Sequence, residues 1–84
     1  MIIAPSIGRV VWFYRAYHRK DEQPYAALVC YVHSDRMVNL AWFDHDGVSH
    51  NMTSVPLIQE GDAPSEYAHC TWVPYQLGQA KRAA

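Results

Sequence analysis

The stretch VNLAWFDHDGVSHNMTSV, from Val38 to Val55, decides the fold class. Apolar and polar residues alternate on both sides of an Asp-Gly pair, a pattern typical of two strands joined by a tight turn. Gly47 can supply the positive φ that such turns require. Because successive strand residues face opposite ways, the first strand carries large side chains on both faces: Leu40 and Trp42 on one, Ala41 and Phe43 on the other. We therefore expect one face to fill a core and the other to meet a partner.

The whole chain predicts five short strands, two within this stretch and three outside it, separated by turns and loops. The first is rich in β-branched and aromatic residues, and the last is limited to a sheet edge by Pro74. Pro56 is expected to close the fourth strand, and the tail from Tyr75 is the one weak helix candidate. The predicted strands are Ile7–Arg15, Tyr25–His33, Met37–Asp44, Val48–Val55 and Tyr67–Tyr75. Five short antiparallel strands in so small a chain predict an all-β fold, a small SH3-like barrel.

The chain of 84 residues predicts one domain over residues 1–84, with a flexible leader at 1–6 and a flexible tail at 78–84. Half of the residues are apolar or aromatic, whereas 18% are charged. A domain of this size buries only about 60–65% of its unfolded surface. The apolar supply therefore exceeds what one small core hides, and we expect a homo-oligomer, a dimer or a multiple of one.

Charge and hydropathy exclude two broad classes of partner. The net charge is −1 with neutral histidines, and the densest basic run, Arg15 to Lys20, is followed directly by two acidic residues. General DNA or RNA binding is therefore not expected. No apolar run approaches the roughly 20 residues of a membrane span. No signal peptide is expected at the N-terminus, and Cys30 and Cys70 are interpreted as buried, reduced thiols in a cytosol.

The residues "IGRVVWFYR", "YAALVCYVHSDRMVNLAWFDHDG", "TSVP" and "TWVPY" follow one another in an order that resembles a group of small tailed-phage proteins. Those chains open on a Gly-Arg-Val-Val strand, pass through an Asn-Leu-x-x-Phe-Asp segment and close near a Trp-x-Pro motif. The resemblance spans Ile7 to Tyr75, and this chain departs from a Trp-Pro ending with Trp72-Val73-Pro74-Tyr75. It implies a bacteriophage origin and a β-barrel, and it implies no activity.

Catalytic and metal chemistry have little support in the residue pattern. Five histidines are present, but no CxxC, HxH or HExxH spacing accompanies them, so no metal and no cofactor are expected. Asp44 and Asp46 are interpreted as turn residues rather than as a pair of acid-base carboxylates. Neither cysteine has a histidine of matching strand parity beside it, as a catalytic thiol would need. The chain is therefore predicted not to be an enzyme, with no catalytic residue.

Eleven aromatic rings remain, more than a barrel this small buries on one face. Only one ring of the pair Trp12/Phe13 and one of the pair Trp42/Phe43 can face inward. An outward ring beside arginine would suit stacking on a base, with the guanidinium group on a phosphate. The candidate ligand-binding residues are Arg9, Trp12, Arg15, Arg36, Trp42, Asn51 and Thr53.

Two functions compete on these observations. The first is a phage-encoded homo-oligomeric sponge that sequesters a nucleotide immune signal, a small cyclic nucleotide or an ADP-ribose derivative, in the host bacterial cytoplasm. Such anti-defence proteins serve immune evasion by binding alone, and here the analogy rests on size, phage origin and aromatic surplus. The second is a protein–protein interaction module or minor virion protein with no small-molecule ligand. It explains the same features.

Overall fold

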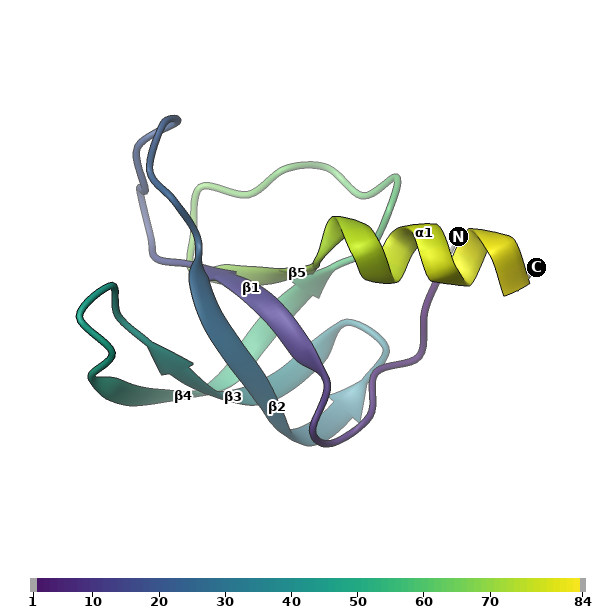
Figure 1. Ribbon diagram of the computed structural model, residues 1–84, viewed down its shortest axis with the longest axis horizontal. Helices are drawn as coiled ribbons and strands as arrows, with labels where there is room; N and C mark the ends of the chain where they lie inside the picture. The colour runs from purple at the N-terminus through teal and green to yellow at the C-terminus, as the bar shows by residue number, and fades with distance from the viewer. Residues whose placement is uncertain (1, 84) are drawn as a thin grey trace.

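The computed structural model describes the backbone of residues 2–83 and the side chains of residues 2–80. They form β1 (Val10–Tyr14), β2 (Tyr25–Ser34), β3 (Met37–Phe43), β4 (Ser49–Ile58), β5 (His69–Trp72) and α1 (Pro74–Ala83), as Figure 1 shows. All five predicted strands are present. They form because their segments are rich in β-branched and aromatic residues and are separated by turn-forming residues. No helix among residues 2–83 has both the length and the apolar character needed to cross a membrane.

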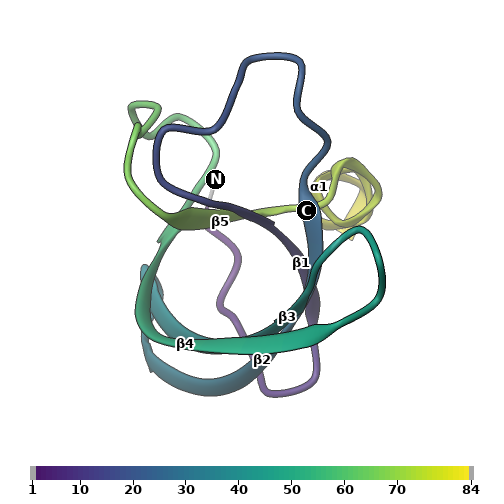
Figure 2. The same ribbon diagram turned by 90° about the vertical axis from the view of Figure 1, so that its left-hand side faces the viewer.

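The strands close into a barrel in the order β1–β2–β3–β4–β5, because β5 also pairs with β1 (Figure 2). This confirms the prediction of a small all-β, SH3-like barrel. The prediction that every pair is antiparallel is wrong at one place, since β4 and β5 run parallel, with Leu57 opposite Cys70. The connection over residues 59–68 carries the chain back across the end of the barrel, so β5 enters in the direction of β4 (Figure 1).

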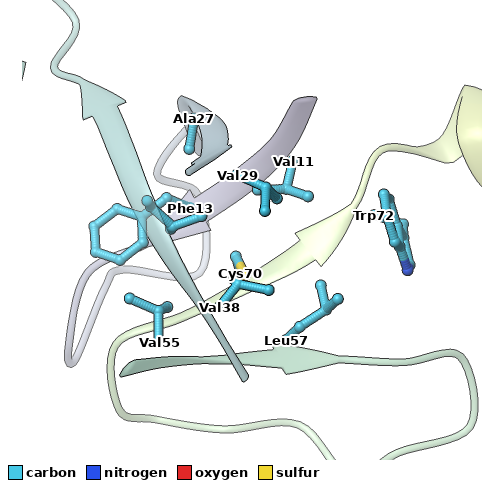
Figure 3. Packing of buried hydrophobic residues seen from close by; sticks show 10 residues of the cluster. Val11, Phe13, Ala27, Val29, Val38, Val55, Leu57, Cys70 and Trp72 are labelled. Carbon is cyan, nitrogen blue, oxygen red and sulfur yellow. The ribbon is translucent and has the colours of Figure 1, made fainter. Parts of the chain in front are cut away.

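The core lies inside the barrel and takes alternate residues from every strand (Figure 3). This alternation follows from the period-two geometry of strands. In β1, for example, Val11 and Phe13 are buried, whereas Val10 is exposed and Trp12 is only partly buried. The buried apolar residues are Val11, Phe13, Ala27, Val29, Val38, Leu40, Val55, Leu57, Cys70 and Trp72.

Bulges bend the two long strands around this core. In β2 the pairing skips Cys30, which lies between the pairs Val29–Leu40 and Tyr31–Asn39. An extra residue shifts the alternation, so Val32 packs against the core and Tyr31 is exposed. Cys30 is exposed because its parity is opposite to that of Val29, and the expectation that it is buried is wrong.

Pro56 does not end β4, contrary to the sequence-based expectation. It lies where β4 changes partner, since Val55 still pairs with Val38 of β3 and Leu57 already pairs with Cys70 of β5. A proline removes one backbone donor but allows an extended backbone, so a changeover beside a bulge tolerates it. That bulge is at Ser54, where φ is 54°.

The buried Gln59 ties the N-terminal segment and the β2–β3 turn to β5. Its Nε2 donates to the carbonyl oxygens of Ile3 and Asp35 at 2.9 and 2.7 Å, and its Oε1 accepts from the Ile3 N–H at 3.1 Å and from Trp72 Nε1 at 3.2 Å. The predicted flexible leader is therefore held at Ile3. The predicted flexible tail is helical through Ala83, and Met1 and Ala84 lie outside the described residues.

Helix α1 explains why the last strand is shorter than predicted. Pro74 is its first residue, a position that proline favours because its missing N–H would have no partner there. Leu77 packs against the barrel core. The helix lies where the sequence offered only a weak candidate and where a flexible tail was predicted, and the predicted extension of the strand to Tyr75 is wrong.

Candidate interaction surface

Six apolar side chains form one contiguous patch on the outside of β1, β2 and β3. Residues directly opposite one another on neighbouring strands point to the same side of a sheet. The register aligns them in two adjacent rows, Trp12–Ala26–Phe43 and Val10–Leu28–Ala41. We call these six residues the outer face.

The outer face is open to solvent among the described residues. Val10 and Leu28 are 51% and 39% exposed, Ala26 is also exposed, and the other three are partly buried. In a domain this small, apolar side chains gathered in two rows make a candidate interaction surface rather than scattered surface residues. The site residues chosen from the sequence include Trp12 but not Phe43, because Trp42 was chosen from that pair. Val10 and Leu28 were missed. Their parity with the two rings was the available signal.

The structure decides which ring of each adjacent pair faces inward. Phe13 and Trp42 lie inside and stack, with ring centroids 4.9 Å apart. Trp12 and Phe43 therefore lie outside, one on each flank of Ala26. Inward and outward rings follow from strand parity once one core residue is known, and the sequence alone did not identify that residue.

The inward-facing aromatic rings near the β3–β4 turn pack against one another. The Trp42 ring stacks on Phe13 on one side and on His50, 4.3 Å away, on the other. Tyr25 stacks on His45 at 4.4 Å. These packed faces leave no slot for a nucleobase between them. The buried Nε1 of Trp42 has no acceptor within the described part of the chain.

Asp44 organises the hairpin turn, in agreement with its interpretation as a turn residue. Its Oδ1 accepts from the backbone N–H groups of Asp46 and Val48, both at 3.0 Å, and its Oδ2 lies 2.9 Å from His50 Nε2. The hydrogen bond with His50, followed by the one from Val48, lowers the pKa of the Asp44 carboxyl. Gly47 has φ of 84°, as the predicted turn requires.

Two of the three predicted phosphate-binding arginines are already paired with carboxylates. Arg15 holds Glu22 through two hydrogen bonds of 2.9 and 2.7 Å, and Arg36 holds Asp62 through two of 3.0 and 3.2 Å. These bonds lower the pKa of both carboxyls. Arg9 has no ion pair within residues 2–80.

The predicted ligand-binding residues do not converge on one place in a single chain. Arg15 follows β1 and Arg36 follows β2, so the two arginines lie at opposite ends of the barrel. The ten-residue strand β2 lies between them and spans about 30 Å if extended. Trp12 and Trp42 face opposite sides of the sheet. Asn51, opposite Ala41, borders the outer face, and Thr53 precedes the bulge at Ser54.

Two shallow hollows lie elsewhere, and none of the predicted ligand-binding residues lines either of them. The first has a volume of about 190 Å³ and lies between the end of β4, β5 and α1. This is smaller than the usual site for a small molecule, about 300–1,000 Å³. Its Gln59 is already hydrogen-bonded on both polar atoms, which indicates a structural role. The second, of about 220 Å³, is lined by Arg19, Asp21 and Glu22.

The cysteines and histidines of the described residues do not gather into a metal-binding cluster. Both thiols are free, and burial raises the pKa of Cys70 to about 12. Residues 2–80 contain no cluster of three or more histidine, cysteine or acidic side chains placed to hold a metal ion. Buried His69 stacks on Tyr14 at 5.0 Å, and its Nδ1 lies 2.7 Å from the Tyr67 carbonyl oxygen.

A second group of exposed rings lies where the β1–β2 and β4–β5 connections meet. Tyr17 and Tyr67, 72% and 67% exposed, make an edge contact with centroids 6.1 Å apart. Tyr17 has φ of 53°, and its N–H donates to the Glu66 carbonyl oxygen at 2.7 Å.

Comparison with models of known protein families, with curated proteins and with solved structures found no match.

Proposed function

We propose that the protein is a homo-oligomeric binding protein, without catalytic activity, in which the outer face is the contact between subunits. The observation that carries this proposal is the alignment of Trp12, Val10, Leu28 and Phe43 in two adjoining rows on one exposed side of the sheet. Burying apolar surface contributes about 25 cal/mol per Å². An exposed apolar face can pair with its own copy, because the same residues then meet across a twofold axis.

The border of this face raises no electrostatic obstacle to self-pairing. Asn51, Ser49 and Thr71 flank the rows, and none of them is charged. The net charge of −1 also keeps repulsion between two copies small. A second copy therefore suits the surface better than a strongly charged partner does.

Protein contact has better support than capture of a nucleotide signal. Capture needs arginines free to meet phosphate, and Arg15 and Arg36 are each held by a carboxylate at opposite ends of the barrel. Arg9 is the remaining candidate. A bacteriophage origin and location in the host cytoplasm belong to the same proposal and rest on the motif resemblance alone.

Light scattering at micromolar concentration tests the proposal. Wild type should have a mass of at least two chains. Leu28→Glu should have the mass of one chain, because it places carboxylates in an apolar contact. We expect this variant to raise the dissociation constant of the oligomer by about 100-fold or more. Tyr67→Glu is the matched control, since it adds the same charge at an exposed ring outside the outer face. A wild-type mass near 9.6 kDa would overturn the proposal.

Calorimetry with cyclic dinucleotides, cyclic trinucleotides and ADP-ribose derivatives tests the narrower sponge function. Binding by wild type that is lost in Arg9→Ala would support it. If wild type binds none of these compounds, the sponge function is excluded and only the protein-interaction function remains.

A further inference from the structure

The first half of β4 is an open strand edge. β4 pairs with β3 from Ser49 to Pro56, but it pairs with β5 only at Leu57 and Ile58. All six residues from 49 to 54 are exposed on both sides of the strand. In Figure 2 this half of β4 runs apart from β5 toward the β3–β4 turn.

The hydrogen-bond pattern of the hairpin shows which backbone groups face this edge. The Asp44 N–H donates to the Val48 carbonyl oxygen, so Asp44 and Val48 form a hydrogen-bonded pair. In an antiparallel ladder such pairs alternate with non-bonded ones. Trp42–His50 is therefore the next bonded pair, and the N–H and C=O groups of Ser49 and Asn51 point away from β3. These groups repeat at about 6.8 Å along the edge.

The edge lacks the usual protection against strand addition. Natural proteins block exposed edges with lysine, proline or a bulge. Residues 49–53, Ser-His-Asn-Met-Thr, contain none of these, and the bulge comes only at Ser54. The second half of β2 also extends beyond its pairing with β1, but irregularities in its pairing with β3 beside Cys30 and His33 interrupt it. The straight part of β4 is therefore the better template.

We propose that this edge binds an extended segment of a different polypeptide as an added strand, in the manner of β-augmentation. The side chains beside it define the ligand. On the inner side His50 and Met52 border the added strand, and Met52 is 36% exposed, so apolar residues fit there. On the other side Ser49 and Asn51 favour polar residues. The ligand is thus an uncharged strand with apolar residues at every second position.

A second copy of the chain is the weaker occupant, an argument that rests on the proposed function. If the outer face already joins two copies, a second kind of self-contact on each subunit extends into open chains unless its symmetry happens to close. A segment from another protein adds to the edge without that consequence.

Proline substitution separates backbone recognition from side-chain recognition. Asn51→Pro removes the outward N–H, and proline is tolerated on an edge where the N–H faces solvent. Asn51→Ala changes the side chain and keeps the N–H, so it is the matched control. Circular dichroism would establish that both variants keep the barrel.

The probe is a library of random linear peptides panned on immobilised wild type, followed by anisotropy with the selected peptides. We expect binders with apolar residues at alternate positions, and affinity weakened about 10- to 100-fold in Asn51→Pro but little changed in Asn51→Ala. Failure to select any binder, or equal affinity for both variants, overturns the proposal. If Asn51→Pro does not fold, selected peptides with N-methyl groups on alternate amides provide the test, and undiminished affinity for both methylation registers overturns it.

The two proposals fail in different ways. A monomeric wild type that still binds the peptides would remove the outer-face contact and leave the strand edge. Open-ended assemblies of wild type that Asn51→Pro dissolves would make a second copy the occupant of the edge and overturn the inference.

Discussion

Replacing Gln59 by Ala should destabilise the protein more than any surface substitution. Gln59 is 2% exposed and makes four side-chain hydrogen bonds, two to Ile3 and one each to Asp35 and Trp72. No other side chain joins the leader, the β2–β3 turn and β5 in this way among the described residues.

The magnitude follows from the groups left behind. Trp72 is 3% exposed, so its Nε1 would lose its acceptor without gaining water, at a cost of about 1–3 kcal/mol. The backbone groups of Ile3 and Asp35 lie nearer the surface and can be partly hydrated, which adds about 1 kcal/mol. The lost methylene and amide packing adds about 1 kcal/mol. We expect a loss of about 3–5 kcal/mol, against a total stability of roughly 4–13 kcal/mol for this length.

Urea unfolding followed by far-ultraviolet circular dichroism measures this loss. Trp72→Phe removes the indole donor together with part of the ring, and the lost hydrogen bond alone should cost about 1–2 kcal/mol. In the double variant the two costs should not add, because both remove the same bond. A Gln59→Ala loss below about 1 kcal/mol, or full additivity with Trp72→Phe, would refute the reasoning.

Three further predictions concern single groups. In the native protein, one thiol should react rapidly with a thiol reagent, because Cys30 is exposed while burial raises the pKa of Cys70 to about 12; Cys30→Ser should abolish that reaction, and two rapid thiols would contradict the assignment. Gly47→Ala should cost about 1–2 kcal/mol in urea unfolding, because φ is 84° there, and an unchanged midpoint would mean that the turn adopts another geometry. The pKa of Asp44 is lowered in the folded state, so the carboxylate stabilises the fold above the unfolded pKa of about 4, and this contribution is lost as pH falls through the folded pKa. Below about pH 4 the urea midpoint of Asp44→Asn should therefore fall less than that of wild type. Parallel pH profiles for the two proteins would contradict this prediction.

The number and order of the strands and the β3–β4 turn could be predicted from the sequence. These features depend on residues close together in the chain. Period-two alternation marks each strand, and Asp44 and Gly47 provide a carboxylate and a positive φ within one turn. The same alternation showed that one ring of each adjacent aromatic pair had to leave the core.

The candidate surface was only partly predictable. The sequence pointed to Trp12 as a contact residue, but it also selected Trp42, which the structure packs between Phe13 and His50. Parity separates two alternating sets without saying which set faces inward. That choice depends on barrel closure, and closure depends on the pairing of β1 with β5, which lie far apart in the chain.

Tertiary structure alone decided the features that join distant segments. Arg36 meets Asp62 across 26 positions of sequence, so no local pattern could show that this arginine is occupied. The parallel β4–β5 pair, the passage of β4 through Pro56 and the Gln59 network have the same origin. The open edge on β4 also depends on tertiary structure, because β5 pairs with only the last part of β4. Every residue except proline carries the same backbone N–H and C=O groups, so the sequence does not show which of these groups remain unpaired.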